Sequence, residues 1–299
     1  MVKILFIGVF DTANRSTNNA QLRGFLKQKA EVIGINFREK RAQIGPEALD
    51  QLIIDTCKTR TPDLVVFSKC AELDTRVFRE CSEITTTCLW WMDPLTTLQE
   101  TPGMIQKARE VSFVCTGVAN TMSVFAAANP SVHYVLEGYD SLFHKPFDSA
   151  QDLDVTFIGS LHTERQQLIA QITHPVNHIS NAYALDHAKT VARSKVNLNF
   201  STAGGASDRI YKVLGAKGFL ITSDWEGRNE LFKDGEDLVI YSDMSDLNEK
   251  IAYYLKNPHF RDKIREQGYK TVQGMTKDAW AAQILQIYNE RKQTNELTS

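Results

Sequence analysis

The stretch from Lys195 to Ser223 constrains the fold most, because it combines strand, loop, helix and strand in one short run. Apolar side chains occupy alternate positions of its first segment, with the period of a strand: Val196, Leu198 and Phe200. Ser207 or Asp208 stands where a helix N-cap belongs, and Gly218 ends the helix before a second apolar strand. The pattern predicts a strand–helix–strand unit of a parallel α/β sheet.

The loop inside this stretch is small, polar and rich in glycine. It runs from Ser201 to Ser207 and contains the adjacent pair Gly204 and Gly205. Free backbone N–H groups at a helix N-terminus, beside glycines that let a ligand approach, form a site for an anion. Arg209, two residues into the helix, adds a planar cation suited to a phosphate. The loop therefore indicates a phosphate site, or else an ordinary turn whose glycines only make the bend.

Strands and helices alternate at short spacing along the rest of the chain. In the first half, apolar runs predict strands at Lys3–Val9, Val32–Phe37, Leu64–Phe67, Thr85–Trp91, Val111–Cys115 and His133–Leu136. The segment Glu137–Ala150 has no clear period and reads as a linker, after which the alternation restarts. We expect an α/β protein of two Rossmann-like domains whose parallel sheets face an interdomain cleft, because open α/β sheets bind ligands beyond their strand ends.

The composition of the 299 residues narrows the class of partner. The net charge is −2, with 34 Lys and Arg against 36 Asp and Glu. The chain therefore lacks the strong excess of basic residues that is typical of proteins that bind nucleic acids or membranes. The first sixty residues carry ten Lys and Arg against six Asp and Glu, which indicates either solvated helix faces or an anionic ligand near this end.

The cysteine pattern and the apolar runs indicate the compartment. Five cysteines in the first half form no CxxC pair, so we expect reduced thiols and no zinc site. No run has the length of a membrane span, and the N-terminal apolar run is too short for a signal peptide. We therefore expect a cytoplasmic protein.

Several segments of the second half, in order, carry a family resemblance. They are the strand and Gly-Ser turn of Asp154–Ile169, the loop and helix described above, the segment Glu230–Val272, and the linker sequence EGYDSLFHKP. Together they resemble the group 1 glycosyltransferase domain of GT-B enzymes, in particular the CgeB-like branch. In the first half only TTTCLWWMDP is similar to the family, at its tryptophan–aspartate–proline strand end.

The resemblance implies a domain organisation and a substrate. It implies an acceptor-side Rossmann-like domain at 1–140, a donor domain at 151–275, and a helix at 276–299 that packs back on the first domain. The donor would be a nucleotide-sugar, with a UDP-sugar favoured, serving as substrate with no further cofactor. The implied donor contacts are Gly159, Ser160, Arg165, Ser201, Gly204, Gly205, Arg209 and Tyr211.

Two arginines would serve where other enzymes use a metal. Arg165 lies about one turn into the helix after Gly159 and Ser160, and it is either a diphosphate ligand or a surface arginine. With Arg209 it could stabilise the charge that grows on a leaving diphosphate. Because no Asp-x-Asp metal motif of the kind used by the other main glycosyltransferase fold is recognised, we expect metal-independent transfer.

The chain departs from the family at Lys212, which stands where many relatives carry a glutamate that holds the ribose hydroxyls. This departure puts the usual ribose contact in doubt. Glu226 or Glu230 could take over that contact, or the donor could differ.

Two carboxylates at predicted strand ends are candidates for the catalytic base. Asp93 follows an apolar strand and precedes Pro94, so it either accepts a proton from the acceptor hydroxyl or forms an Asx turn. Asp11 follows the first strand and is the second candidate base, with loop or helix capping as the alternative.

These residues together predict a glycosyltransferase that moves a sugar from a nucleotide-sugar to an acceptor hydroxyl. The acceptor is open: a glycan, a small molecule, a protein or modified DNA. One alternative is transfer to hydroxylated bases in DNA, with the base flipped into the cleft. Another is a sugar-nucleotide-binding protein without catalysis, which Lys212 alone supports.

Overall fold

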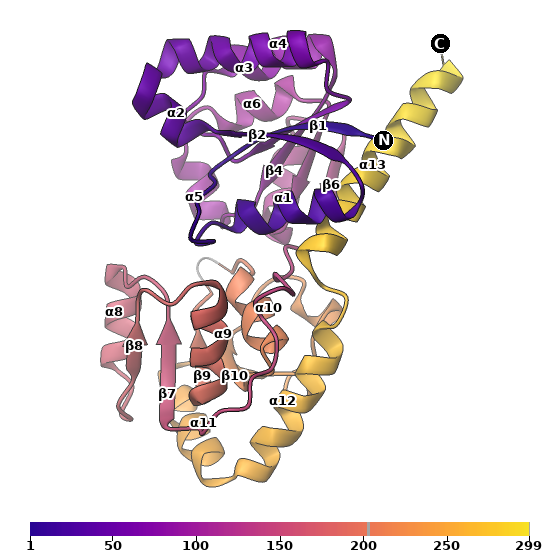
Figure 1. The fold of residues 1–299 in the computed structure, drawn as a ribbon. Coiled ribbons are helices and arrows are strands. Elements are labelled where there is room, and N and C mark those ends of the chain that lie inside the picture. The colour runs from indigo at the N-terminus through magenta and orange to yellow at the C-terminus, as the bar shows by residue number, and fades with distance from the viewer. Residues whose placement is uncertain (202–203, 299) are drawn as a thin grey trace. The chain divides into compact units, whose positions relative to one another are not determined.

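The structure is a computed structural model that describes residues 1–201 and 204–298. The chain divides into two compact units, shown as a ribbon in Figure 1. Unit 1 comprises residues 1–137 and 277–299, and unit 2 comprises residues 138–276. Unit 1 is thus built from both ends of the chain.

Unit 1 is organised around a parallel sheet of six strands in the order β2-β1-β3-β4-β5-β6. The strands are β1 (Lys3–Gly8), β2 (Glu31–Asn36), β3 (Leu64–Ser68), β4 (Thr86–Trp91), β5 (Phe113–Thr116) and β6 (Val132–Tyr134). The helices are α1 (Thr17–Lys27), α2 (Phe37–Ile44), α3 (Pro46–Arg60), α4 (Thr75–Ile84), α5 (Leu95–Glu100), α6 (Met104–Glu110), the 3₁₀ turn η1 (Ala119–Thr121), α7 (Met122–Ala126) and α13 (Lys277–Thr298).

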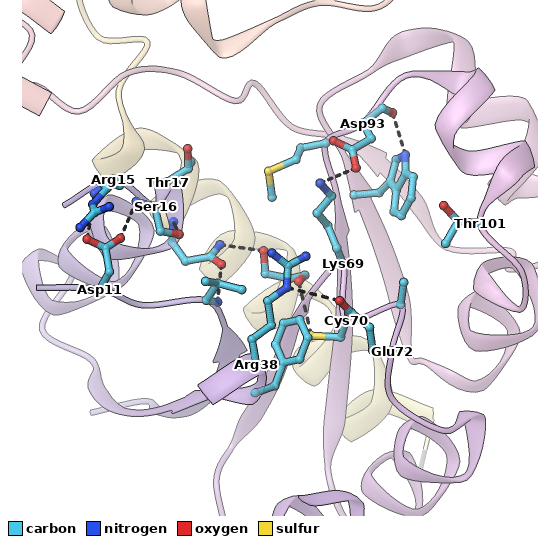
Figure 2. A pocket seen from close by; sticks show the side chains of 17 residues that line it. Asp11, Arg15, Ser16, Thr17, Arg38, Lys69, Cys70, Glu72, Asp93 and Thr101 are labelled. Atoms are coloured by element: carbon cyan, nitrogen blue, oxygen red, sulfur yellow. Dashed lines mark hydrogen bonds and ion pairs between the residues drawn. The ribbon is translucent and has the colours of Figure 1, made fainter. Parts of the chain in front are cut away.

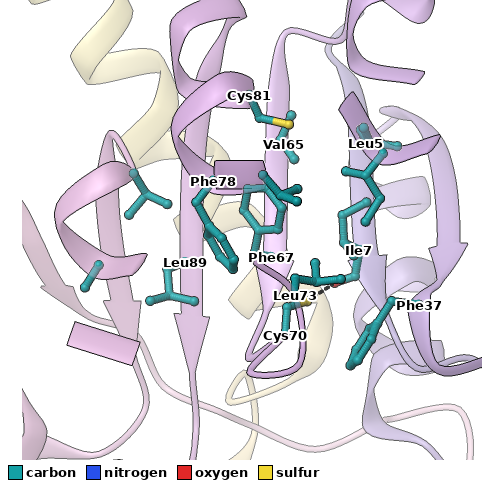
Figure 3. Packing of buried hydrophobic residues seen from close by; sticks show 14 of the residues in the cluster. Leu5, Ile7, Phe37, Val65, Phe67, Cys70, Leu73, Phe78, Cys81 and Leu89 are labelled. Atoms are coloured by element: carbon teal, nitrogen blue, oxygen red, sulfur yellow. Dashed lines mark hydrogen bonds between the residues drawn. The ribbon is translucent and has the colours of Figure 1, made fainter. Parts of the chain in front are cut away.

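The two faces of this sheet bury separate cores. Leu5 and Ile7 of β1 point into one core, which α3, α4 and α6 cover and which Figure 3 shows in part. Ile4 and Phe6 point to the other face, where the Phe25 ring of α1 lies 5.1 Å from that of Trp280 of α13. Neighbouring residues of a strand serve opposite faces, so a strand covered on both sides needs the continuous apolar run seen in the sequence.

Unit 2 has a parallel sheet of five strands in the order β11-β10-β9-β7-β8. The strands are β7 (Leu153–Ile158), β8 (Asn177–Ile179), β9 (Ser194–Asn199), β10 (Leu220–Ser223) and β11 (Val239–Tyr241). The helices are α8 (Thr163–Ala170), α9 (Ala184–Arg193), α10 (Asp208–Gly215), the 3₁₀ turn η2 (Arg228–Glu230), α11 (Met244–Lys256) and α12 (Pro258–Val272).

The predicted α/β class with parallel sheets is confirmed, and two local assignments change. The strand predicted to reach Phe37 ends at Asn36, because the Asn36 side chain accepts a hydrogen bond from Glu39 N and caps α2, which the sequence analysis did not predict. The segment predicted as a linker belongs to unit 2 from Gly138 onward, since Tyr139 is 3% exposed in the unit 2 core.

A close approach of α1 and α13 gives a testable prediction. A Cβ at Gly24 would lie 2.4 Å from the Lys277 carbonyl oxygen, and backbone cannot move aside as a flexible side chain can. Helix propensity alone favours Gly24→Ala by about 1 kcal/mol. Because overpacking costs about 1–3 kcal/mol, we expect a net fall in the melting temperature. Leu26→Ala, at an exposed position of the same helix, should change stability little, and a Gly24→Ala protein as stable as wild type would contradict the packing argument.

Candidate functional site

The first part of the candidate site lies in unit 2 where β7 and β9 end and α10 begins. Ser207 caps α10 by accepting a hydrogen bond from Arg209 N, as the sequence pattern predicts. The Arg209 guanidinium then reaches back across the strand ends. Its Nε donates to the Ile158 carbonyl at 2.7 Å, and its Nη1 donates to Asn199 Oδ1 at 2.7 Å.

The turn after β7 is shaped around this guanidinium. Gly159 has φ +145°, a conformation that L side chains rarely adopt, and a Cβ there would lie 2.4 Å from Arg209 Nη2. The Gly159 carbonyl is hydrogen-bonded to His178 Nε2 at 2.8 Å, which ties the turn to β8. The glycine is therefore required both by its backbone angle and by the neighbouring cation.

Arg165 joins Arg209 at the same strand end. Its Nη1 donates to the Ser160 carbonyl at 3.1 Å, whereas its buried Nε has no hydrogen-bond partner among the described residues. Both guanidinium carbons lie over the Phe157 ring, at 5.6 Å for Arg165 and 4.8 Å for Arg209. The structure brings together these two residues, which the sequence analysis proposed as a pair.

The electrostatics of this pair are unusual for a protein surface. Burial, and then the charge of Arg165, lower the pKa of Arg209 to about 10. Burial also lowers the pKa of Arg165. In the described part of the chain, no carboxylate lies within ion-pair distance of either guanidinium; Asp208, which precedes Arg209 in the sequence, pairs with Lys212. Two partly desolvated cations without a paired anion form a site that favours a bound anion.

The loop residues proposed as donor contacts lie around this position. Ser201 N donates to Ser223 Oγ at 2.7 Å, which joins the end of β9 to β10. Gly204 is exposed with φ +67°, and Gly205 is buried. Thr202 and Ala203, which complete the proposed loop, lie outside the described residues.

Tyr211 does not occupy an accessible position. Its side chain is 1% exposed and packs in the unit 2 core, with its ring 6.1 Å from that of Phe232. Tyr211 was assigned from the sequence as a donor contact, and the structure corrects this assignment. Tyr211 is a core residue, because its buried ring anchors α10 in the core of unit 2. Lys212 forms an ion pair with Asp208 one turn earlier on α10.

A buried pair of histidines lies close to α10, and the sequence analysis did not predict it. The rings of His144 and His187 lie 5.2 Å apart and are 4% and 6% exposed. Burial, followed by the charge of Lys212, lowers the pKa of His144 to about 4. Burial, the neighbouring His144 and Lys212 lower the pKa of His187 well below its ordinary value. Their positions, far apart in sequence, carry no local signal of this contact.

The second part of the candidate site is a pocket of about 500 Å³ in unit 1, shown in Figure 2. It lies where β1, β3 and β4 end, and its lining includes both candidate bases, Asp11 and Asp93. Each acid in the pocket has a cation beside it. Asp93 pairs with Lys69, Glu72 pairs with Arg38 at 3.3 Å, and Arg15 lies beside Asp11 (Figure 2).

Lys69 is aimed at Asp93 by a strained turn. Lys69 and the following Cys70 have φ +64° and +54°, left-handed values that are unfavourable for residues other than glycine. The Lys69 amide is held by the Trp90 carbonyl at 2.9 Å. The Trp91 Nε1 donates to the Asp93 carbonyl at 2.7 Å and fixes the Asp93 backbone. Asp93 therefore sits at a fixed place in the pocket, with a cation within reach of its carboxylate.

Asp11 has a different set of contacts. Its carboxylate accepts hydrogen bonds from the backbone N–H groups of Arg15 at 3.0 Å and Ser16 at 2.7 Å. Partial burial acts to raise the pKa of Asp11, but the backbone N–H groups outweigh it and hold the pKa below the usual value. These contacts match the capping alternative for Asp11 and make its carboxylate a weaker base.

Among residues 1–201 and 204–298, no group of three or more His, Cys, Asp or Glu side chains is placed to hold a metal ion. No helix in the described part of the chain combines the length and apolar character that crossing a membrane requires.

Comparison with known proteins identifies the class to which unit 2 is similar. Residues 140–286 match the protein family described as glycosyl transferase-like. The match spans nearly all of unit 2 and the beginning of α13. No match was found among curated proteins.

Solved structures extend the likeness to the whole chain. Anabaena Alr3699/HepE in complex with UDP and glucose has 13% sequence identity and a TM-score of 0.72, over 97% of this chain and 100% of that chain. Sucrose-phosphate synthase from Thermosynechococcus elongatus has 10% identity and a TM-score of 0.73, over 98% of this chain and 100% of that chain. The GT-B type fold predicted from the sequence is confirmed by these two likenesses.

The histidine pair predicts how stability depends on pH. The unfolded state takes up protons near the ordinary histidine pKa of 6.5, while folded His144 does so only near 4. Stability should therefore be full above pH 6.5 and fall as the pH drops toward 4, by about 3 kcal/mol for His144 alone. Denaturant titrations at pH 7.5, 6 and 5 would measure this slope.

Two variants separate this cause from general acid sensitivity. His144→Gln should flatten the slope between pH 6.5 and 4, whereas His259→Gln, at an exposed position, should leave it unchanged. An unchanged slope in His144→Gln would show that the buried pair does not titrate as described.

Proposed function

We propose that this protein transfers a sugar from a nucleotide-sugar, with a UDP-sugar favoured, to an acceptor hydroxyl. The observation that carries the proposal is the guanidinium pair of Arg165 and Arg209 at the carboxyl ends of β7 and β9, which has no ion-pair partner among the described residues. A diphosphate is an anion of the right chemistry to occupy that position, because planar guanidinium groups bind phosphate oxygens through paired hydrogen bonds. The glycosyl transferase-like match over residues 140–286 supports this choice of anion.

In this mechanism the arginines act on the leaving group. As the bond between the sugar and the diphosphate breaks, negative charge grows on the phosphate oxygens. Fixed cations near those oxygens stabilise the transition state more than the ground state, without a metal ion. Gly159, Ser160, Ser201, Gly204 and Gly205 would line the approach of the donor.

Asp93 is the proposed base on the acceptor side. Its carboxylate lies in the pocket of unit 1 on a backbone fixed by Trp91, and it forms an ion pair with Lys69. A charged carboxylate can accept the proton of an acceptor hydroxyl as that oxygen attacks the sugar. The capping contacts of Asp11 make it the weaker candidate.

The likeness to the CgeB-like branch and a cytoplasmic location also remain part of the proposal. The first concerns substrate choice within the glycosyltransferases, and the second rests on the reduced state expected of the five cysteines, all of which are buried and free in the structure.

Removing one guanidinium tests the donor site. Arg165→Gln should weaken UDP binding by about tenfold to a hundredfold, since a hydrogen bond to a charged group contributes about 1.5–3 kcal/mol. Arg209→Gln should weaken it at least as much, with some loss of stability because Arg209 also bonds Ile158 and Asn199. Isothermal titration with UDP measures both effects, and activity should persist in a metal chelator.

The matched control is Arg193→Gln in the same unit. Arg193 pairs with Asp152 at 2.6 Å just before β9 begins, at the opposite end of the strand from Arg209. Its loss should leave UDP affinity unchanged. Equal affinity in Arg165→Gln and Arg193→Gln, or strict dependence of transfer on added Mg²⁺ or Mn²⁺, would overturn the donor-site proposal.

Substitution of Asp93 tests the base. Asp93→Asn should lower kcat by about a hundredfold or more while UDP affinity stays constant, because general base catalysis contributes about 10²–10⁴ in rate. Asp11→Asn should instead lower the melting temperature more than kcat, since it removes a loop cap. Unchanged turnover in Asp93→Asn would remove Asp93 from the mechanism.

A further inference from the structure

A second cavity of about 860 Å³ lies in unit 1, beside the pocket that holds Asp93. Its lining residues come from α1, from the start of α2, and from the ends of β1 and β2 at the edge of the sheet. Phe10, Leu22 and Gly34 form its apolar floor. Polar side chains surround the floor: Asp11, Thr12, Asn19, Arg23, Asn36, Glu39 and Lys40.

The backbone conformation at the glycine in the floor, Gly34, does not require a glycine. Gly34 is exposed, and its φ lies outside the left-handed range that favours glycine. A Cβ at this position would lie 3.3 Å from Leu22 and 3.4 Å from the Phe10 ring, so a larger side chain would fill the floor of the cavity. The missing side chain on β2 therefore leaves the Phe10 ring and Leu22 open to a ligand.

The walls of the cavity are held in place by side chains. Asn36 Nδ2 donates to the Phe10 carbonyl at 2.6 Å, and Asn19 Oδ1 accepts from the Asp11 amide at 3.1 Å, while Asn19 Nδ2 donates back to the Asp11 carbonyl. The Phe10 ring packs edge-on against Phe6 of the core, with ring centroids 5.3 Å apart. A floor fixed in this way is formed before any ligand arrives, which lowers the entropic cost of binding.

The two cavities of unit 1 meet at Asp11, which lines both. The pocket with Asp93 is polar, and each of its three acids lies beside a cation, so it suits an uncharged group with several hydroxyls. The cavity at Phe10 offers apolar surface within a polar rim. A single ligand that spans both would carry hydroxyls at one end and an apolar group at the other.

We propose that the acceptor is an uncharged amphipathic molecule, whose hydroxyl-bearing end lies at Asp93 and whose apolar end lies on Phe10 and Leu22. This inference rests on the proposed transferase function for the identity of the ligand as acceptor, whereas the apolar subsite itself rests on the geometry of Phe10, Leu22 and Gly34. The subsite takes an alkyl or aromatic group that is attached to a polyhydroxylated head.

Binding of methyl and hexyl glycosides tests the subsite directly. The full-length protein is titrated with the methyl and hexyl glycosides of glucose, galactose and mannose, below the concentration at which the hexyl compounds form micelles. Amide and methyl NMR signals of Gly34 and Leu22 report on the cavity. Hexyl compounds should shift both signals and bind at least tenfold more tightly than their methyl partners, because five further methylene groups leave water.

Variants of the floor locate the effect. Gly34→Val should abolish the preference for hexyl compounds by filling the cavity. Leu22→Gln should weaken the same preference, and it serves as the test if Gly34→Val does not fold. Leu26→Gln, at an exposed position on α1 outside the cavity, should leave it unchanged. If no hexyl compound shifts Gly34 or Leu22, or if hexyl and methyl compounds bind alike, the proposal is wrong.

UDP affinity, measured on the same samples, separates this proposal from the one on which it rests. Gly34→Val should bind UDP like wild type. Loss of hexyl binding with UDP binding intact would overturn only the amphipathic acceptor. Hexyl binding without any UDP binding would overturn the transferase and leave an apolar subsite that serves another reaction.

Discussion

The desolvation of the Arg209 guanidinium is the constraint on which the candidate site of unit 2 depends. Two of its nitrogens are committed to Ile158 and Asn199, so the cation is fixed on the protein instead of following a ligand. Gly159 has to be a glycine because a Cβ at this position would collide with the Arg209 guanidinium. The nearby Arg165 adds a second positive charge, and in the described part of the chain no carboxylate is paired with either group. An anion that binds there therefore gains favourable electrostatic interactions that the protein does not already satisfy.

In unit 1, by contrast, the charged side chains of the pocket are paired. In its 500 Å³ pocket every acid has a basic neighbour. Paired charges attract an ion less strongly than unpaired ones, yet they still present hydrogen-bond donors and acceptors. The two units thus differ in the electrical character of the ligand each can hold, although both are built on the same strand–helix alternation.

The parts of this architecture that could be predicted from the sequence are those with a local pattern. Apolar runs predicted the parallel strands, and glycines with an arginine at a helix start predicted the position of the anion site that we propose at Arg209. Tyr211 was misjudged although the pattern contained the answer, because it lies three residues before Leu214 on the apolar side of α10. The Lys69–Asp93 pair, the histidine pair and the cavity at Gly34 depend on residues that only the tertiary fold brings together, and no local spacing records them.

The last helix, α13, covers one face of the sheet of unit 1. Trp280, Ala281 and Ile284 of α13 fill the face that β1 and α1 leave apolar, so that face stays uncovered until the end of the chain has been made. Residues 138–276 are continuous and carry their whole core within themselves. During synthesis, the half of the protein that emerges first from the ribosome is therefore the half that finishes folding last, and a chain truncated before residue 277 would combine a complete second unit with an unfinished first one.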